Sequence, residues 1–378
     1  MEFRDLKQQY RILKQDIDAA VEKVMTNANF ISGREVTELE GRLAEYVGVR
    51  HCITCANGTD ALQLALMAWD IGKGDAVFLP DFTFFSTAEV VPWVGATPVF
   101  VDIERETFNL SPKALENAIR KILQEGKLVP RAVIAVDLFG QPADYPAIRE
   151  IADRYHMLLL EDGAQGFGGR IGERKACSFG DISTTSFFPA KPLGCYGDGG
   201  AVFTDCDEWA ELIRSFKVHG KGSGKYDNIR LGMNSRLDTI QAAVLQVKLR
   251  HFACFELESV NRVAAWYEQH LGENVGKPVV KEGFLSSWAQ YTVLLDDETE
   301  RKRLQGELGR RGIPSMIYYP KGMHDQEALQ CYVDEHAAEY LRVTETVCRS
   351  CLSLPMHPYL REEEVIHICG EINAILSE

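Results

Sequence analysis

The feature that most constrains the fold is a regular alternation of short apolar runs and helical patterns between residues 50 and 205. Runs of strand length lie at 51–55, 76–80, 97–102, 132–138 and 157–160, with helical patterns at 59–69, from about 86, from 111 and at 145–154. The run at 157–160 is apolar throughout, as expected for a strand buried on both faces of a parallel sheet. This alternation predicts right-handed βαβ crossovers, and therefore an α/β sheet covered by helices.

The pattern changes after residue 205. A helix is expected at 205–216, a polar glycine-rich loop at 219–228, and a long amphipathic helix from about 237 towards 267. A strand at 288–295 and helices near 300–311, 339–350 and 363–377 follow. We therefore predict an N-terminal helical segment (1–30), a large domain with a mostly parallel sheet (31–254) and a smaller C-terminal α/β domain (255–378).

Charge and composition exclude several classes of protein. The formal net charge of −14 argues against a nucleic-acid or anionic-membrane surface, although a local pocket for one phosphate is compatible with it. The first 18 residues are charged throughout, unlike a secretory signal, and no apolar run approaches the roughly 18–20 residues that cross a bilayer. We expect a cytoplasmic protein that binds neither nucleic acid nor membrane.

Ten cysteines include two pairs with the C-x-x-C spacing, Cys52/Cys55 and Cys348/Cys351. A zinc site usually gathers such pairs close in sequence, whereas these lie near opposite ends of the chain. Free cysteine behaves as a small apolar residue, and an intracellular location disfavours structural disulfides. We predict neither a metal site nor a disulfide.

A first candidate site is the turn Asn57-Gly58-Thr59-Asp60, which joins a predicted strand to a predicted helix. Glycine in such a turn allows backbone N–H groups to point at an anion, and the helix N-terminus adds partial positive charge. Taken alone, the turn is better explained by an ordinary helix cap.

Two further candidates lie downstream. Asp162 directly follows the buried strand at 157–160, at the strand end where open α/β sheets bind ligands. Lys191 lies in SFFPAKPLG, among aromatic residues and prolines, and an apolar setting lowers the pKa of a lysine and frees its amine as a nucleophile. A turn-capping aspartate and a surface lysine are the ordinary alternatives.

The combination is far more specific than its parts. An anion-binding turn, an acid at a strand end and a partly buried lysine are together what pyridoxal 5'-phosphate (PLP) requires. The turn would hold the phosphate, the acid would keep the ring nitrogen protonated, and the lysine would bind the aldehyde.

Six runs resemble the DegT/DnrJ/EryC1/StrS sugar aminotransferases: NGTDALQLAL, DFTFFSTAE, EDGAQGFG, SFFPAKPLGCYGDGGA, NSRLDTIQAA and SLPMHPYL. They occur in the order and spacing of that family, and the match spans essentially the whole chain. The resemblance implies a PLP-dependent transferase type I fold and a homodimer with shared active sites. It is greatest to the members that aminate UDP-2-acetamido-2-deoxy-3-oxo-D-glucuronate with L-glutamate. It thus implies a role in bacterial surface polysaccharide synthesis, such as lipopolysaccharide O-antigen.

Carried over residue by residue, the resemblance assigns catalytic roles to Lys191 and Asp162. It assigns the cofactor to Gly58, Thr59, Asp60, Phe84, Asp162, Gln165, Ser186, Lys191 and Asn234, the last reaching the phosphate from the other subunit. It assigns the substrate to Arg236, Tyr318, Tyr319 and His324, with Arg236 meeting the sugar carboxylate across the dimer. His324 also fits a structural histidine.

Three alternatives stay open. The first is a 4-keto sugar aminotransferase on the same fold. The second is the dehydratase branch of the family, in which histidine replaces the lysine, and Lys191 argues against it. The third is a non-catalytic regulator on this fold, which the intact set Thr59, Asp162, Ser186, Lys191 and Asn234 disfavours.

Overall fold

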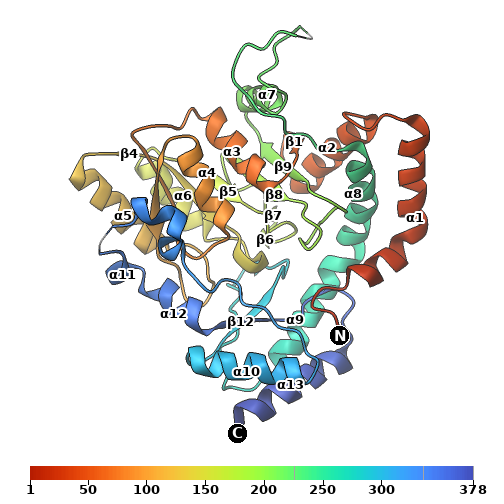
Figure 1. Ribbon diagram of the computed structural model, residues 1–378, viewed down its shortest axis with the longest axis vertical. Coiled ribbons are helices and arrows are strands. Elements are labelled where there is room, and N and C mark those ends of the chain that lie inside the picture. The colour runs from red at the N-terminus through yellow and green to blue at the C-terminus, as the bar shows by residue number, and fades with distance from the viewer. Residues whose placement is uncertain (225, 335, 378) are drawn as a thin grey trace.

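The large domain is built on one seven-stranded sheet. The structure, a computed structural model, describes residues 1–224, 226–334 and 336–377 (Figure 1). Its strands run in the order β1-β9-β8-β5-β4-β2-β3. Their bounds are β1 His51–Cys55, β2 Asp75–Pro80, β3 Thr97–Val101, β4 Val129–Val136, β5 Leu158–Asp162, β8 Ile182–Ser186 and β9 Gly200–Thr204. Neighbouring strands pair in parallel except at β9, which is antiparallel to both β1 and β8, so the predicted mostly parallel sheet is confirmed.

Helices cover both faces of this sheet. Successive residues of each strand point to opposite faces, so each strand contributes apolar side chains to both layers of helices. Val77 and Leu79 of β2 pack with α3 (Gly58–Ala68), α4 (Phe85–Trp93) and α7 (Asp207–Phe216). Ala76 and Phe78 pack instead with α5 (Pro112–Glu125) and α6 (Tyr145–Arg154). Over β1 and β9, that second face is covered by α2 (Arg34–Val47) and α8 (Thr239–His251).

Local sequence signals set several of the helix ends. The side chain of Ser111 accepts a hydrogen bond from the N–H of Ala114 at the start of α5, and Pro112 occupies the first turn. Gly126 ends α5 with a left-handed φ of 63°. Asn57 caps α3 in the same way, accepting from the N–H of Asp60 at 2.8 Å.

A second apolar core lies in the C-terminal part of the chain. It is formed by α9 (Leu257–His270), α10 (Glu298–Arg310), α13 (Glu362–Ser377) and the antiparallel pair β11 (Tyr291–Leu294) and β12 (Cys351–Leu354). The segment between α10 and β12 returns to the large domain, where Met323 and Leu329 pack into its core. The exact domain boundaries stay a prediction.

The remaining elements connect these two parts. At the N-terminus, α1 (Leu6–Asn27) packs along α8 (Figure 1). A small sheet holds β6 (Arg170–Ile171), β7 (Arg174–Lys175) and β10 (Phe284–Leu285), and short helices are α11 (Ala337–Tyr340) and α12 (Arg342–Ser350). Single 3-10 turns occupy η1 (Leu138–Gly140), η3 (Met323–Asp325) and η4 (Glu327–Tyr332).

Three details differ from the sequence predictions. Strands β8 and β9 were not expected. The predicted helix from 237 towards 267 is interrupted by a π-helical segment, η2 (Phe252–Glu256), which separates α8 from α9. The predicted helix at 339–350 is divided at Leu341, whose backbone angles leave the helical region.

The described ranges contain neither a membrane-spanning helix nor a cluster of metal ligands. None of the described helices is long and apolar enough to cross a membrane. Within residues 1–224, 226–334 and 336–377, histidine, cysteine and acidic side chains nowhere gather in threes that could hold a metal ion. All ten cysteines are free thiols.

Gly200, where β9 begins, tests how tightly the sheet packs against the turn before α3. A Cβ added there would lie 2.4 Å from the carbonyl oxygen of Asn57. We expect Gly200→Ala to lower stability by about 1–3 kcal/mol, because backbone must move to relieve the overlap. The measurement is the urea midpoint of unfolding.

The matched control is Gly41→Ala on the exposed face of α2, where an added Cβ meets nothing within 4 Å. This change should stabilise the helix by up to about 1 kcal/mol, since alanine restricts the unfolded chain more than glycine does. Equal midpoints for the two variants would contradict the packing described at Gly200.

Candidate active site

The candidate residues meet at one edge of the sheet. Asp162 is the last residue of β5, Ser186 is the last residue of β8, and Gly58 opens α3 after β1. These three strands run in the same direction, so their carboxyl ends lie together. In open α/β sheets this edge is where ligands bind.

Asp162 is a buried carboxylate at the bottom of the site. Its side chain is 5% exposed. One oxygen accepts a hydrogen bond from the hydroxyl of Thr87 at 2.8 Å, and the other accepts from the N–H of Ala164 at 3.2 Å. Burial raises the pKa of Asp162, while Thr87, Ala164 and the charge of Lys191 oppose that rise. A cation bound beside this acid would favour its charged form.

Lys191 is the basic partner of this acid. It lies on the loop between β8 and β9, and its N–H donates to the carbonyl of Phe188 at 2.9 Å. Burial lowers the pKa of its amine from 10.5 to about 8, an effect that Asp162 opposes and Arg4 reinforces. A substantial fraction of the amine is therefore neutral and nucleophilic near pH 8, unlike that of a solvated lysine.

The N-terminus of α3 forms an anion-binding surface beside these two residues. Within the described part of the chain, the backbone N–H groups of Gly58 and Thr59 have no acceptor. A Cβ on Gly58 would lie 2.8 Å from the Cβ of Ser186, so only glycine allows the helix to approach β8 this closely. The hydroxyl of Thr59 is 2.7 Å from that of Ser86 on α4.

Aromatic residues and an amide close the other side. Gln165 donates from its side-chain nitrogen to the hydroxyl of Tyr319 at 3.2 Å, and its oxygen accepts from the N–H of Phe139 at 2.7 Å. Phe84 lies 6.2 Å from the ring of Tyr319 and is 53% exposed. Tyr318 packs against Tyr319, with ring centroids 5.7 Å apart.

Two more buried acids lie beside Asp162 and have a structural role. Glu161 accepts hydrogen bonds from the N–H of Phe179 at 2.6 Å and the hydroxyl of Ser183 at 2.8 Å. Asp137 accepts from the hydroxyl of Tyr145 at 2.6 Å. Burial, together with the charge of Glu161, raises the pKa of Asp137 well above its ordinary value. The charge of Glu161 thus favours the protonated form of Asp137.

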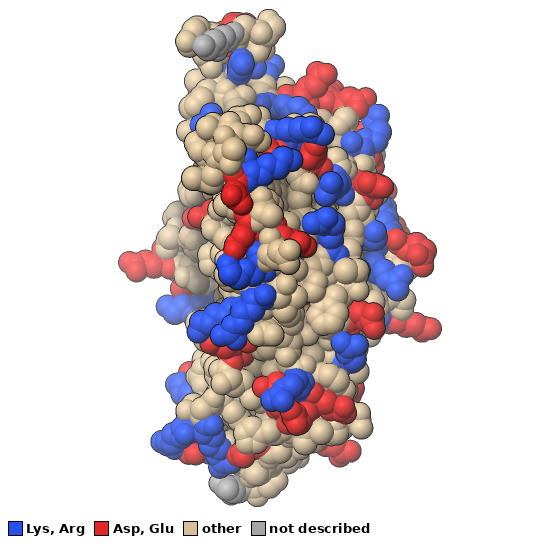
Figure 2. Space-filling model, turned by 90° about the vertical axis from the view of Figure 1, so that its right-hand side faces the viewer, with Lys and Arg blue, Asp and Glu red and all other residues tan. Residues whose placement is uncertain are grey.

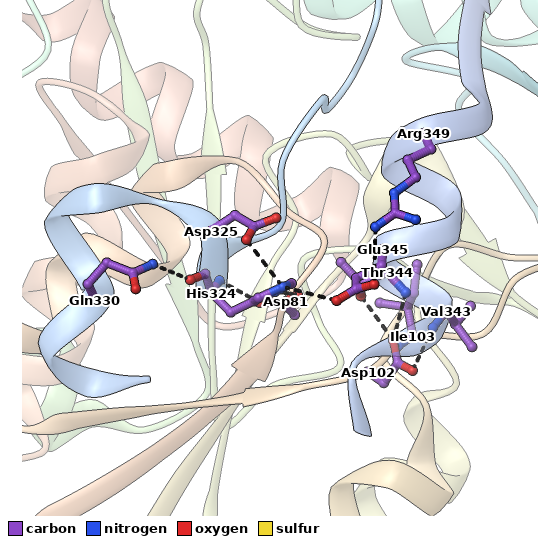
Figure 3. Close-up of polar contacts among 10 residues, drawn as sticks. All are labelled: Asp81, Asp102, Ile103, His324, Asp325, Gln330, Val343, Thr344, Glu345 and Arg349. Atoms are coloured by element: carbon purple, nitrogen blue, oxygen red, sulfur yellow. Dashed lines mark hydrogen bonds and ion pairs between the residues drawn. The ribbon is translucent and has the colours of Figure 1, made fainter. Parts of the chain in front are cut away.

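His324 lies in a polar cluster that ties the C-terminal part to the sheet (Figure 3). Its Nδ1 lies 2.6 Å from the carboxylate of Asp81, the residue after β2, and its Nε2 is 3.9 Å from Glu345 on α12. Burial lowers the pKa of His324, but the hydrogen bond and charge of Asp81 outweigh it and raise the pKa. Both ring nitrogens thus face carboxylates, and a direct contact of this histidine with substrate stays a prediction.

Asn234 and Arg236 flank Ser235, whose hydroxyl accepts from the N–H of Ala56 at 3.0 Å. Within one chain, neither makes a hydrogen bond or ion pair with Lys191 or Asp162 in the described ranges. Asn234 is exposed, and its backbone pairs with that of Val218. Arg236 lines a surface groove of about 950 Å³ with residues 218, 219, 221, 226 and 228–232, which include Ile229 and Leu231. A second groove, of about 790 Å³ between β3, α5 and residues 331–334, 337 and 340, contains neither Lys191 nor Asp162. The assignment of Asn234 to the cofactor and of Arg236 to the substrate therefore stays a prediction that requires a second subunit.

Two residues at the site were not expected from the sequence. Thr87 holds Asp162 from the first turn of α4, and Arg4 donates from Nη2 to the backbone carbonyl of Lys191 at 2.9 Å. Thr87 lies within the run DFTFFSTAE, so an ordinary helix-start threonine was its only local signal. Arg4 is 187 positions from Lys191 and has no local signal at all.

These residues fit PLP on their own chemistry. The unsatisfied N–H groups of α3, with the hydroxyls of Ser186 and Thr59, would hold the phosphate. The buried carboxylate of Asp162 lacks the cation that a protonated ring nitrogen would supply, and Lys191 offers an amine for the aldehyde. The fold and site define a PLP-dependent transferase of fold type I.

Comparison with known proteins narrows this class. Residues 11–373 match the DegT/DnrJ/EryC1/StrS aminotransferase family. The chain belongs to this family, and it is an aminotransferase whose cofactor is PLP.

Individual relatives match over almost the full length. A UDP-2-acetamido-2-deoxy-3-oxo-D-glucuronate aminotransferase from Pseudomonas aeruginosa is 44% identical, covering 98% of this chain and 99% of its own. A UDP-N-acetyl-3-dehydro-α-D-glucosamine 3-aminotransferase from Acidithiobacillus ferrooxidans is 38% identical, covering 98% and 97%. A solved DegT/DnrJ/EryC1/StrS aminotransferase from Brucella abortus has a TM-score of 0.96 at 47% identity, with both chains fully covered.

The lowered pKa of Lys191 has a measurable consequence. Only the neutral amine attacks the PLP aldehyde, so the rate of PLP uptake by apoprotein should rise with pH through a midpoint near 8. Asp162→Asn should move this midpoint lower, because Asp162 raises the pKa of the amine. Stopped-flow absorbance against pH gives both midpoints. A wild-type midpoint near the ordinary value of 10.5 would contradict the desolvated setting.

Proposed function

We propose that this aminotransferase moves the amino group of L-glutamate to the 3-keto group of a UDP-linked sugar, namely UDP-2-acetamido-2-deoxy-3-oxo-D-glucuronate. The products are 2-oxoglutarate and the 3-amino sugar, so the amino group and the keto oxygen exchange places and no external oxidant is needed. The observation that carries the reaction type is that Asp162, at the end of β5, and Lys191, on the loop after β8, are close enough for each to shift the pKa of the other, at the sheet edge where α3 begins.

The substrate class is supported by the relatives. The two relatives at 44% and 38% identity are both named for UDP-sugars with a keto group at C3. A 3-keto substrate is therefore favoured over the 4-keto alternative. We place the reaction in the cytoplasm, on the way to bacterial surface polysaccharides such as the O-antigen of lipopolysaccharide.

The residues of the chain have distinct tasks in this reaction. PLP, when bound, withdraws electrons from the carbon that carries the transferred amino group, so a proton leaves that carbon readily. The Lys191 amine would take this proton from one reacting carbon and return it to the other. A pKa near 8 suits both the removal and the return of a proton. Asp162 keeps the ring nitrogen protonated, and Thr87 fixes the orientation of that carboxylate.

A homodimer with shared sites is the form we propose for the working enzyme. Phe84 and Phe188, which flank the site, are 53% and 52% exposed, and Leu231 beside Arg236 is 92% exposed. Another apolar groove, of about 550 Å³, lies between Tyr196 and the α1 residues Tyr10, Ile17 and Val21. Exposed apolar surface on this scale favours a protein interface.

The surface around α1 has a charge pattern that agrees with such an interface. On this face acidic and basic side chains are interspersed and separated by uncharged surface (Figure 2). A nucleic-acid interface would need a continuous basic surface instead. The second subunit would bring its own Asn234 and Arg236 to the site.

The proposed function is tested with purified protein, L-glutamate and matched 3-keto and 4-keto UDP-sugars. We expect turnover of the 3-keto sugar, and the formation of 2-oxoglutarate measures it. Turnover of the 4-keto sugar alone would transfer the assignment to the 4-amino class, and a wild-type protein without PLP would revive the non-catalytic alternative.

Lys191→Ala serves as the mechanistic control for this assay. It should lower kcat on the order of 10²–10⁴-fold or more and abolish the visible absorbance of lysine-bound PLP, since the variant lacks the amine that we assign to the aldehyde. Lys73→Ala, at an exposed position before β2, should leave both unchanged. Retention of the absorbance band in Lys191→Ala would exclude Lys191 as the PLP lysine.

The shared-site dimer predicts complementation between two inactive variants. Mixed dimers of Lys191→Ala and Arg236→Glu contain one site with both native residues and one with neither. With random subunit exchange, half of the dimers are mixed, so activity should recover to about a quarter of wild type. Activity no higher than that of the separate variants would place Arg236 in the same site as Lys191 of its own chain, or outside it.

A further inference from the structure

The N-terminal segment of the chain runs past the active site instead of ending in solvent. The carbonyl of Phe3 accepts a hydrogen bond from the N–H of Met356 at 3.1 Å, and the ring of Phe3 lies 6.2 Å from that of Tyr318. Asp5 then caps α1 by accepting from the N–H of Gln8 at 2.8 Å. Arg4, between these two anchors, is thereby held between the Lys191 loop and the tyrosines of the substrate side.

Arg4 uses little of its hydrogen-bonding capacity there. Its Nη2 donates to the carbonyl of Lys191 at 2.9 Å. Within the described ranges, the side chain of Arg4 makes no other hydrogen bond and no ion pair. A guanidinium has five N–H donors in a planar fork, so most of them stay available to a ligand.

The carboxylate that acts on Arg4 is already engaged with other groups. Glu256 is the carboxylate that acts on it most strongly, but the oxygen of Glu256 is bonded to Gln9 at 2.7 Å and to the hydroxyl of Tyr359. Glu256 also faces Lys248, whose ammonium is buried and has no hydrogen-bond partner in the described part of the chain. Arg4 and Lys248 thus share the charge of Glu256, while Lys191 is acted on by Asp162.

We propose that Arg4 is a carboxylate-binding residue of the active site, contributed by the same chain that carries Lys191. Its position beside Lys191 and Tyr318 and its unused planar donors suit a bidentate contact with a carboxylate. The inference rests on the proposed function, in which both substrates carry such a group: the amino donor and the uronate sugar. It goes beyond that function by naming a residue that the motifs do not contain.

The test is calorimetric binding to the PLP-loaded protein with three probes. Glutarate represents the amino donor without its amine, and UDP-glucuronate and UDP-glucose differ only in the sugar carboxylate. Arg4→Gln should weaken at least one carboxylate probe on the order of 10- to 100-fold, as expected when a charged hydrogen bond is lost. UDP-glucose should bind unchanged, and Arg4→Lys should recover part of the loss.

Arg11→Gln is the matched control, because it removes the same charge from an exposed position on α1. Selective loss of glutarate assigns Arg4 to the amino donor, and selective loss of UDP-glucuronate assigns it to the sugar. Equal weakening of all three probes, or of none, would overturn the proposal, as would a wild-type protein that binds neither carboxylate probe. Binding of UDP-glucose by wild type separates these results from failure of the proposed function.

Discussion

The structure depends on one buried electrostatic relation, between the carboxylate of Asp162 and the amine of Lys191. Asp162 is buried and Lys191 is partly buried, and burial shifts each pKa towards the neutral form, upward for the acid and downward for the amine. Each also opposes the shift of the other. A cation beside the acid and an aldehyde at the amine would each lower the free-energy cost of burying these groups. A protonated pyridine ring that carries an aldehyde supplies both together.

The rest of the large domain keeps this pair in place. Parallel pairing brings the ends of β5 and β8 together, and the antiparallel strand β9 returns the Lys191 loop to the sheet. Below them, Glu161 is held by the N–H of Phe179 and the hydroxyl of Ser183, so one buried charge is satisfied by the backbone and hydroxyls instead of by a cation. Asp162 differs from Glu161 because its protein partners are one hydroxyl, one N–H and the charge of Lys191.

Much of this arrangement could be predicted from the sequence, because the signals were local. The alternation of apolar runs indicated the sheet, and Asp162 stood directly after one of them. Strand β8 was missed because its residues Ser183, Thr184 and Thr185 are polar, and their hydroxyls bond to buried acceptors on β5 and the turn after it. Arg4 and Thr87 were missed because their roles exist only once segments far apart in sequence have packed. Tertiary contacts of this kind leave no periodic signal.

The central claim is that Asp162 holds the ring nitrogen of PLP protonated while Lys191 holds the aldehyde. The most direct measurement is the ¹⁵N NMR shift of the pyridine nitrogen in protein loaded with ¹⁵N-labelled PLP, in wild type and in Asp162→Ala. The account predicts the shift of a protonated nitrogen in wild type and of an unprotonated one in the variant. The same protonated shift in both proteins, or an unprotonated shift in wild type, would contradict it.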